Sequence, residues 1–322
     1  MPEDKPLDAF KVASPDSGIR DSLKKLLGIQ PVNDTEWAEA SGSVTKWADS
    51  DNVAYAVKMV SSCSGNAGWM KLEGDTISIL EMAEHQYIVK PHSFLLWNPQ
   101  KKSHSIVHQS GDILVERRAD YQIRAIVSSL VDGKTLSGQI RSEEKCTGVQ
   151  LALDVSSDIV EALEYLHKKG IDCPDLKLGN IIYQNKYKLI CSGPEPSHSV
   201  FLGEAYDKYA YPLSFGLLLL NLATGHDPYN YPIHAKDDIE KAGRQFKRFV
   251  SSPWVGKEQY LKGLYPEKVK ESPELFELIY KLMEMSDEGC NLIQANMRLH
   301  KIKNSEQIES SGQKTYGITW FQ

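Results

Sequence analysis

One short polar stretch between an apolar helix and an apolar strand constrains this chain most. It carries the carboxylate of Asp175, the lysine Lys177 two residues later and the amide of Asn180 three residues further on. Before it, apolar residues at helical spacing predict a long helix over 150–168. After it, Ile181-Ile182 begins a short apolar strand pair. The polar residues are therefore expected on a tight loop between two buried elements.

The D-x-K-x-x-N spacing of this loop resembles the catalytic loop of protein kinases, written H-R-D-L-x-x-x-N. Two flanks depart from the family pattern: Cys173-Pro174 replaces His-Arg, and Cys191-Ser192-Gly193 replaces D-F-G. The resemblance covers about residues 36–300, with the motifs in family order on the expected elements. It implies a degenerate member of the protein kinase superfamily. The implied fold is α+β and bilobal, with a small β-rich N-lobe that has one main helix and a large, mostly helical C-lobe.

The chain order predicts four parts: an arm and short helix in 1–35, an N-lobe in 36–131, a C-lobe in 132–302 and a polar tail in 303–322. Ile19 and Leu23 share one face of the short helix, which Gly28 should end. We expect this helix to pack on the domain that follows.

Two further elements are predicted from the sequence. The segment between Lys90 and Ala125 is longer than a kinase core requires, which predicts an inserted hairpin with strands over 105–108 and 113–116. Near the C-terminus, apolar spacing predicts a last helix near 292–301.

The resemblance also implies the residues of a nucleotide site. Ala56-Val57-Lys58 resembles the V-A-I-K strand, whose lysine contacts the α and β phosphates. Val44, Ala56 and Ile182 match the apolar sandwich around adenine, and Ser128 matches the gatekeeper. The phosphate loop, in contrast, keeps only Gly42 of its glycines, although a backbone cradle needs them for close approach to phosphate.

The catalytic positions are only partly occupied. By resemblance, Asp175 matches the base, Lys177 the lysine that reaches the γ-phosphate and Asn180 one metal ligand. Cys191 replaces the principal metal ligand, and a thiol is a poor ligand for Mg²⁺, which prefers oxygen. Thr76 replaces the glutamate that pairs with the strand lysine, with Glu73 or Asp75 as shifted candidates.

The C-terminal motifs also differ from the pattern of the kinase family. No A-P-E follows Cys191, and Asn291 replaces the arginine that pairs with that glutamate in kinases. Losing one partner of such a buried pair costs about 3–5 kcal/mol, so joint loss is the expected outcome. Tyr211 likewise replaces an aspartate that accepts hydrogen bonds from the catalytic-loop backbone. We therefore expect no platform for a peptide substrate.

These departures predict a pseudokinase rather than an enzyme: a kinase-fold scaffold or allosteric binding protein. Its only expected cofactor is ATP, bound weakly and without Mg²⁺, if any is bound. The alternative is an atypical ATP-dependent phosphotransferase that uses Asp175, Lys177 and Asn180, with Glu195 as a replacement metal carboxylate.

Composition narrows the expected partners. The net charge of −6 argues against a nucleic-acid or acidic-membrane surface. Five scattered cysteines favour free thiols in a reducing compartment. The first ten residues lack the apolar run of a signal peptide, and the apolar run 217–222 is too short to span a bilayer. We expect a protein partner, such as an active kinase or another signalling protein, and a cytoplasmic or nuclear location.

Overall fold

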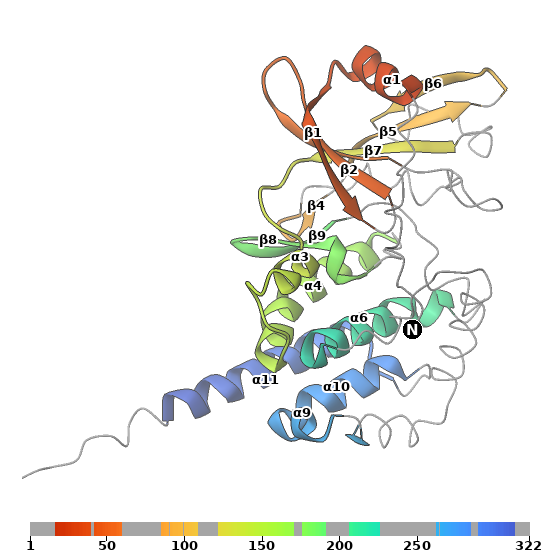
Figure 1. Ribbon diagram of the computed structural model, residues 1–322. Coiled ribbons are helices and arrows are strands. Elements are labelled where there is room, and N and C mark those ends of the chain that lie inside the picture. Colours follow the sequence, from red (N-terminus) through yellow and green to blue (C-terminus); the bar gives the residue numbers. More distant parts are fainter. Residues whose placement is uncertain are drawn as a thin grey trace, which may run out of the picture. The chain divides into compact units, whose positions relative to one another are not determined.

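Contacts divide the chain into two units (Figure 1): unit 1 comprises Met1–Gly74 and Pro91–Leu130, and unit 2 comprises Asp75–Lys90 and Val131–Gln322. The computed structural model describes residues 17–39, 42–59, 85–89, 91–98, 100–108, 122–170, 176–190, 206–225, 262–263, 265–284 and 289–312. The four sequence-based parts stay a prediction. Residues 75–84, which include Thr76, lie outside the described residues.

Unit 1 is built on an antiparallel sheet whose described strands run in the order β1-β2-β3-β7-β5-β6. Alternating and β-branched residues favour these strands. The elements are α1 (Ser17–Leu27), β1 (Gln30–Glu39), β2 (Gly42–Ala48), β3 (Ala54–Met59), β5 (Pro91–Asn98), β6 (Ser103–Val107) and β7 (Gln122–Ser129).

Helix α1 contributes to the core of unit 1. Its Ile19 and Leu23 are buried in one cluster with Trp47, Val57 and Val127 of the sheet. The helix ends at Gly28, which has a left-handed φ of 68° and donates its N–H to the carbonyl of Lys24. The predicted helix and its packing on the following domain are thus confirmed.

Of the hairpin predicted over 105–108 and 113–116, the structure describes the first strand, most of which lies in β6. Strand β6 pairs with β5, from Asn98↔Ser103 to Phe94↔Val107. The Asn98 side chain closes the turn, because its Oδ1 accepts the N–H groups of Gln100 and Lys101. The structure therefore shows a β5–β6 hairpin that the sequence did not predict, and the hairpin with its turn at 109–112 stays a prediction. Residues 113–116 lie outside the described part.

Unit 2 combines a small sheet with a helical core. Its described strands run β4-β9-β8, with β4 parallel to β9. The elements are β4 (Ile88–Val89), α3 (Leu136–Arg141), α4 (Val149–Lys168), the 3₁₀ turn η4 (Leu178–Asn180), β8 (Ile181–Gln184), β9 (Lys186–Ile190), α6 (Tyr206–Thr224), α9 (Pro266–Glu271), α10 (Pro273–Met283) and α11 (Leu292–Gly312).

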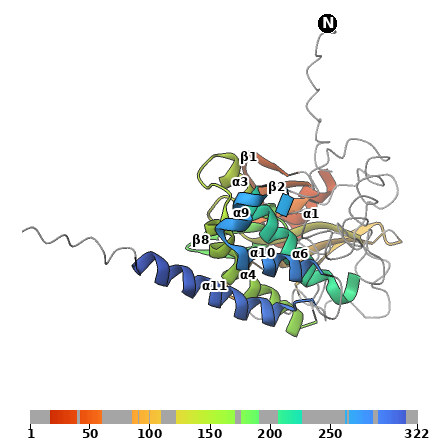
Figure 2. The ribbon, with the colours of Figure 1, turned by 90° about the horizontal axis from the view of Figure 1, so that it is seen from below.

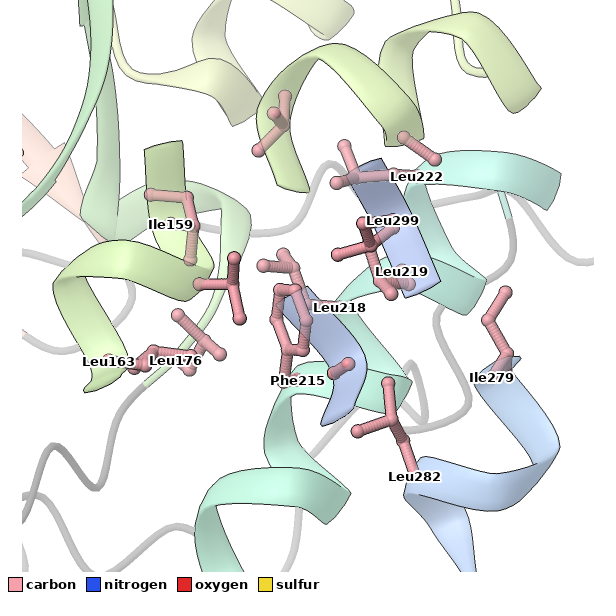
Figure 3. Packing of buried hydrophobic residues seen from close by; sticks show 14 of the residues in the cluster. Ile159, Leu163, Leu176, Phe215, Leu218, Leu219, Leu222, Ile279, Leu282 and Leu299 are labelled. Atoms are coloured by element: carbon pink, nitrogen blue, oxygen red, sulfur yellow. The ribbon is translucent and has the colours of Figure 1, made fainter. Parts of the chain in front are cut away.

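Helices α4, α6, α10 and α11 share one apolar core. Figure 3 shows side chains of this cluster, among them Ile159 of α4, Phe215 of α6, Ile279 of α10 and Leu299 of α11. All four side chains are fully buried. The helix predicted over 150–168 is confirmed by α4, whose apolar residues at helical spacing face this core.

The last helix is longer than the predicted segment 292–301. Helix α11 continues to Gly312, so part of the segment predicted as a polar tail is helical. The reason is that no proline or glycine interrupts the chain between Leu292 and Gly312. No helix among the described residues has the length and apolar character needed to cross a bilayer.

Candidate functional site

The sheet of unit 1 places the predicted nucleotide residues on one face. Antiparallel register pairs Val44 with Lys58, and Ala56 with Ser128. Residues directly opposite each other share a face, and Ala56 and Lys58 are two apart on β3. The other face carries Val57 and the core under α1. All four predicted positions of this unit therefore fall on a single face of the sheet.

Lys58 and Ser128 are both buried, with 9% and 8% of their surfaces exposed. Ser128 also lies opposite Pro91 of β5, so small side chains occupy this part of the sheet. Lysine is rarely buried without a partner. The acids considered as its partner, Glu73 and Asp75, lie outside the described residues.

Three of the predicted residues of unit 2 fall in one continuous segment. Lys177 precedes the 3₁₀ turn η4, and Asn180 closes that turn by donating its backbone N–H to the carbonyl of Lys177, at 2.9 Å. Asn180 is buried, as is Ile182 two residues later on β8. The turn therefore holds the lysine, the amide and the apolar residue in order. Asp175, the predicted base, lies outside the described residues.

A residue that sequence reasoning missed supports this segment. Asp158 of α4 is buried, and its Oδ2 accepts the backbone N–H of Tyr187 on β9, at 2.9 Å. The Lys186 Nζ lies 3.7 Å from Oδ1. Asp158 thus fixes the β8–β9 hairpin that follows the catalytic-loop segment. The sequence signal for this role was an acidic residue at a position that the apolar spacing places on the buried side of the predicted helix.

The segment before β4 also packs on α4. The His85 ring stacks on Tyr165, with ring centroids 4.6 Å apart. The Nδ1 of His85 accepts the N–H of Tyr87, whose carbonyl accepts the N–H of Leu189 on β9. Burial lowers the pKa of His85, and the charge of Glu161 acts weakly in the opposite direction. Burial also raises the pKa of Tyr87, with Asp158 adding to the effect.

Tyr211, which replaces the family aspartate, contacts the helix that leads into the loop. Its ring lies edge-on to His167 at the end of α4, with centroids 5.6 Å apart. The carbonyl of His167 accepts the N–H of Gly170, as expected for a residue of the last helical turn. An aromatic contact therefore joins α6 to the end of α4 near the position where kinases use a carboxylate.

Asn291, at the position of the family arginine, has a different role here. It caps α11: its Oδ1 accepts the N–H of Gln294 at 2.9 Å, and the Gln294 side chain accepts the N–H of Asn291 at 3.1 Å. This reciprocal pair is a capping box. Asn291 is exposed, so its surroundings are not those of a buried ion pair.

Of the metal positions implied by the kinase resemblance, the structure describes Asn180, whereas Cys191 and the alternative carboxylate Glu195 lie outside the described residues. Asn180 offers one amide oxygen, and Cys191, at the position of the main carboxylate ligand, offers a thiol. Mg²⁺ prefers several oxygen ligands, usually including carboxylates. At these two positions the sequence therefore offers one oxygen ligand and no carboxylate.

Comparisons with known proteins establish the fold. No family model matches the chain. The chain is similar to the crystal structure of Rad53 1–466 in complex with AMP-PNP, with a TM-score of 0.56 and 18% sequence identity. This similarity covers 83% of this chain and 64% of that chain. The chain therefore has the bilobal protein kinase fold, as the catalytic-loop motif predicts.

A short stretch of the chain is also similar in sequence to a known protein. Kinase suppressor of Ras 2, from Homo sapiens and from Mus musculus, is 38% identical to the chain over 61 residues. The match spans 19% of this chain but only 6% of each relative.

Proposed function

We propose that this chain is a pseudokinase, which uses the kinase fold to bind other proteins and does not transfer phosphate. The observation that carries the proposal is the role of Asn291. In kinases the arginine at this position pairs with the A-P-E glutamate, whereas here the side chain caps α11. Together with the absence of A-P-E, this arrangement lacks the anchor of a peptide-binding segment.

The chemistry of the catalytic positions supports the same proposal. Lys177 and Asn180 remain in place, but Cys191 replaces the metal carboxylate. Phosphoryl transfer depends on positioning and charge neutralisation by metal ions, so losing that carboxylate removes the main contribution.

The competing function is an atypical phosphotransferase that uses Asp175, Lys177 and Asn180. Incubation of the full chain with labelled ATP, general protein substrates and either Mg²⁺ or Mn²⁺ distinguishes the two. We expect no incorporation above that of an Asp175→Asn control. Incorporation by the wild type that disappears in this control would refute the pseudokinase proposal and establish the phosphotransferase.

We further propose that any nucleotide binding is weak and does not need metal. The common face of Val44, Ala56, Lys58 and Ser128 supports a remnant adenine and phosphate site. The similar Rad53 structure is a complex with AMP-PNP. An Ala56→Phe change places a bulky ring on this face and should abolish the ATP-induced rise in melting temperature. A rise that persists in Ala56→Phe would place binding elsewhere.

The proposed partner is a protein, such as an active kinase or another signalling protein, in the cytoplasm or nucleus. The similarity to Kinase suppressor of Ras 2 supports a signalling context. The 61 matched residues do not identify a specific partner.

A further inference from the structure

Helix α11 carries the two most exposed large apolar side chains among the described residues. Ile293 is 56% exposed and Met297 is 69% exposed. They are four residues apart, so they lie on the same side of the helix. The opposite side is buried in the core of unit 2 through Ala295, Leu299 and Ile302. The helix therefore has a second, solvent-facing apolar strip.

The surroundings of this strip are basic. Between Asn291 and Ser305 the chain has no aspartate or glutamate, whereas Arg298, Lys301 and Lys303 are present. The whole chain, in contrast, has a net charge of −6. Glu306 and Glu309 follow later in the sequence of α11, so the excess of positive charge belongs to its first part, residues 292–305, which carries the strip.

Acids from neighbouring helices neutralise this charge only in part. Glu277 of α10 lies 3.5 Å from Arg298, but the two side chains remain 64% and 46% exposed, so the pair is weak. Glu164 of α4 accepts a hydrogen bond from Asn296. Lys301 is exposed.

The helix also continues past Ile302. Ile302 is the last buried residue described in the chain, and α11 ends at Gly312. Figures 1 and 2 both show α11 continuing beyond α4 and α10. Its final residues include Asn304, three serines and a glycine, which are weak helix formers.

We propose that Ile293 and Met297, with Lys301 beside them, form a docking surface for an amphipathic helix of a partner protein, whose apolar stripe is bordered by aspartate and glutamate. Residues one helical turn apart are typical anchors for helix docking. Charge complementarity selects the acidic flanks. A second copy of this chain is disfavoured, because it would bring another basic α11 to the same surface.

The inference rests on the proposed binding role, but not on the loss of catalysis. The phosphotransfer and nucleotide tests address other residues, so failure of this surface would leave their results unchanged.

The test uses the full chain and a fluorescein-labelled synthetic helix, with leucine at the heptad a and d positions and glutamate at e and g. We expect saturable binding by fluorescence anisotropy that weakens with added salt. A matched peptide with lysine in place of glutamate should not bind. Met297→Glu should weaken binding at least about tenfold, because it places a like charge against the peptide in the centre of the surface.

Matched variants distinguish specific binding at this surface from nonspecific hydrophobic binding. Val53→Glu changes another exposed apolar residue, 51% exposed, in unit 1 and should leave peptide binding unchanged. Lys301→Glu should weaken binding and reduce its salt dependence. Because Met297 is exposed, Met297→Glu should melt at the wild-type temperature. Absence of binding to the acidic peptide, or equal binding by Met297→Glu, would overturn the proposal.

The same proteins test two other ligands for this surface: a second copy of the chain, and the chain's own last residues. Sedimentation of the wild type that shows a dimer, absent in Met297→Glu, would assign the strip to a second copy and overturn the proposal. Tighter peptide binding by Trp320→Ala would mean that the chain's own last residues compete for the strip, which would also overturn it. We expect a monomer and no effect of Trp320→Ala.

Discussion

Asp158 shows how one buried side chain positions the segment after the catalytic loop. Its carboxylate accepts the Tyr187 N–H within the interior of unit 2. Replacing it with alanine leaves a buried donor without its acceptor, which typically costs about 1–3 kcal/mol. We therefore expect Asp158→Ala to lower the free energy of unfolding by about this amount, measured by urea denaturation.

The matched control is Asp158→Asn, which keeps an oxygen for the Tyr187 N–H. It should lose clearly less stability than Asp158→Ala. Equal losses would mean that the carboxylate does not act through this hydrogen bond.

His85 makes stability depend on pH. Burial lowers the pKa of His85 in the folded state, so the unfolded chain takes up this proton first as the pH falls. The contribution is fully present above the ordinary histidine pKa of about 6.5 and decreases as the pH drops below it. Protonation also removes the Nδ1 acceptor from the Tyr87 N–H. The melting temperature should therefore fall through this range.

His85→Phe is the control, because it keeps an aromatic ring against Tyr165 but cannot take up a proton. Its melting temperature should vary less with pH than that of the wild type over the same range. An identical pH dependence in both proteins would rule out His85 as the source.

At the scale of elements, α6 and α10 approach each other closely at Gly216. A Cβ at this position would lie 2.9 Å from both Leu282 and Met283 of α10. Glycine to alanine in a helix normally stabilises by about 0.5–1 kcal/mol, but overpacking costs about 1–3 kcal/mol. We expect Gly216→Ala to be destabilising overall, by thermal unfolding. A stabilised variant would show that the two helices separate without cost.

Helix α11 depends on its N-terminal cap. Asn291→Ala removes the acceptor for the Gln294 N–H and should cost about 1 kcal/mol. Asn291→Asp keeps an acceptor at this position and should be close to the wild type in denaturant unfolding. Similar losses in both variants would argue against the capping role.

At the scale of the whole molecule, each unit has its own apolar core. Ligands that bind only the folded state raise its stability by mass action. Because the proposed site keeps an oxygen ligand at Asn180 but has a thiol at Cys191, we expect the ATP-induced shift in melting temperature to be nearly equal in Mg²⁺ and in EDTA. A shift that requires Mg²⁺ or Mn²⁺ would contradict metal-independent binding.

Much of the fold follows from local pattern in the sequence. Apolar spacing predicts α1 and α4, the resemblance of Ala56-Val57-Lys58 to the V-A-I-K strand predicts β3, and the loop around Lys177 and Asn180 predicts the kinase fold. These signals are readable because each depends on residues close together in the chain. The common face of Ala56 and Lys58 likewise follows from the two-residue period of a strand.

Tertiary structure decided what depends on distant partners. The β5–β6 pairing depends on which turn Asn98 closes, and the acceptor role of Asp158 depends on a hairpin 29 residues away. The capping role of Asn291 depends on α11 beginning at Leu292, and the match of Asn291 to the arginine of kinases gives no sign of it. The need for glycine at 216 arises only where α10 crosses α6. Sequence alone determined the class of fold and the residue types at its catalytic positions. The three-dimensional packing determined which of the remaining residues hold that fold in place, because burial and hydrogen-bond partners are set by residues far apart in the chain.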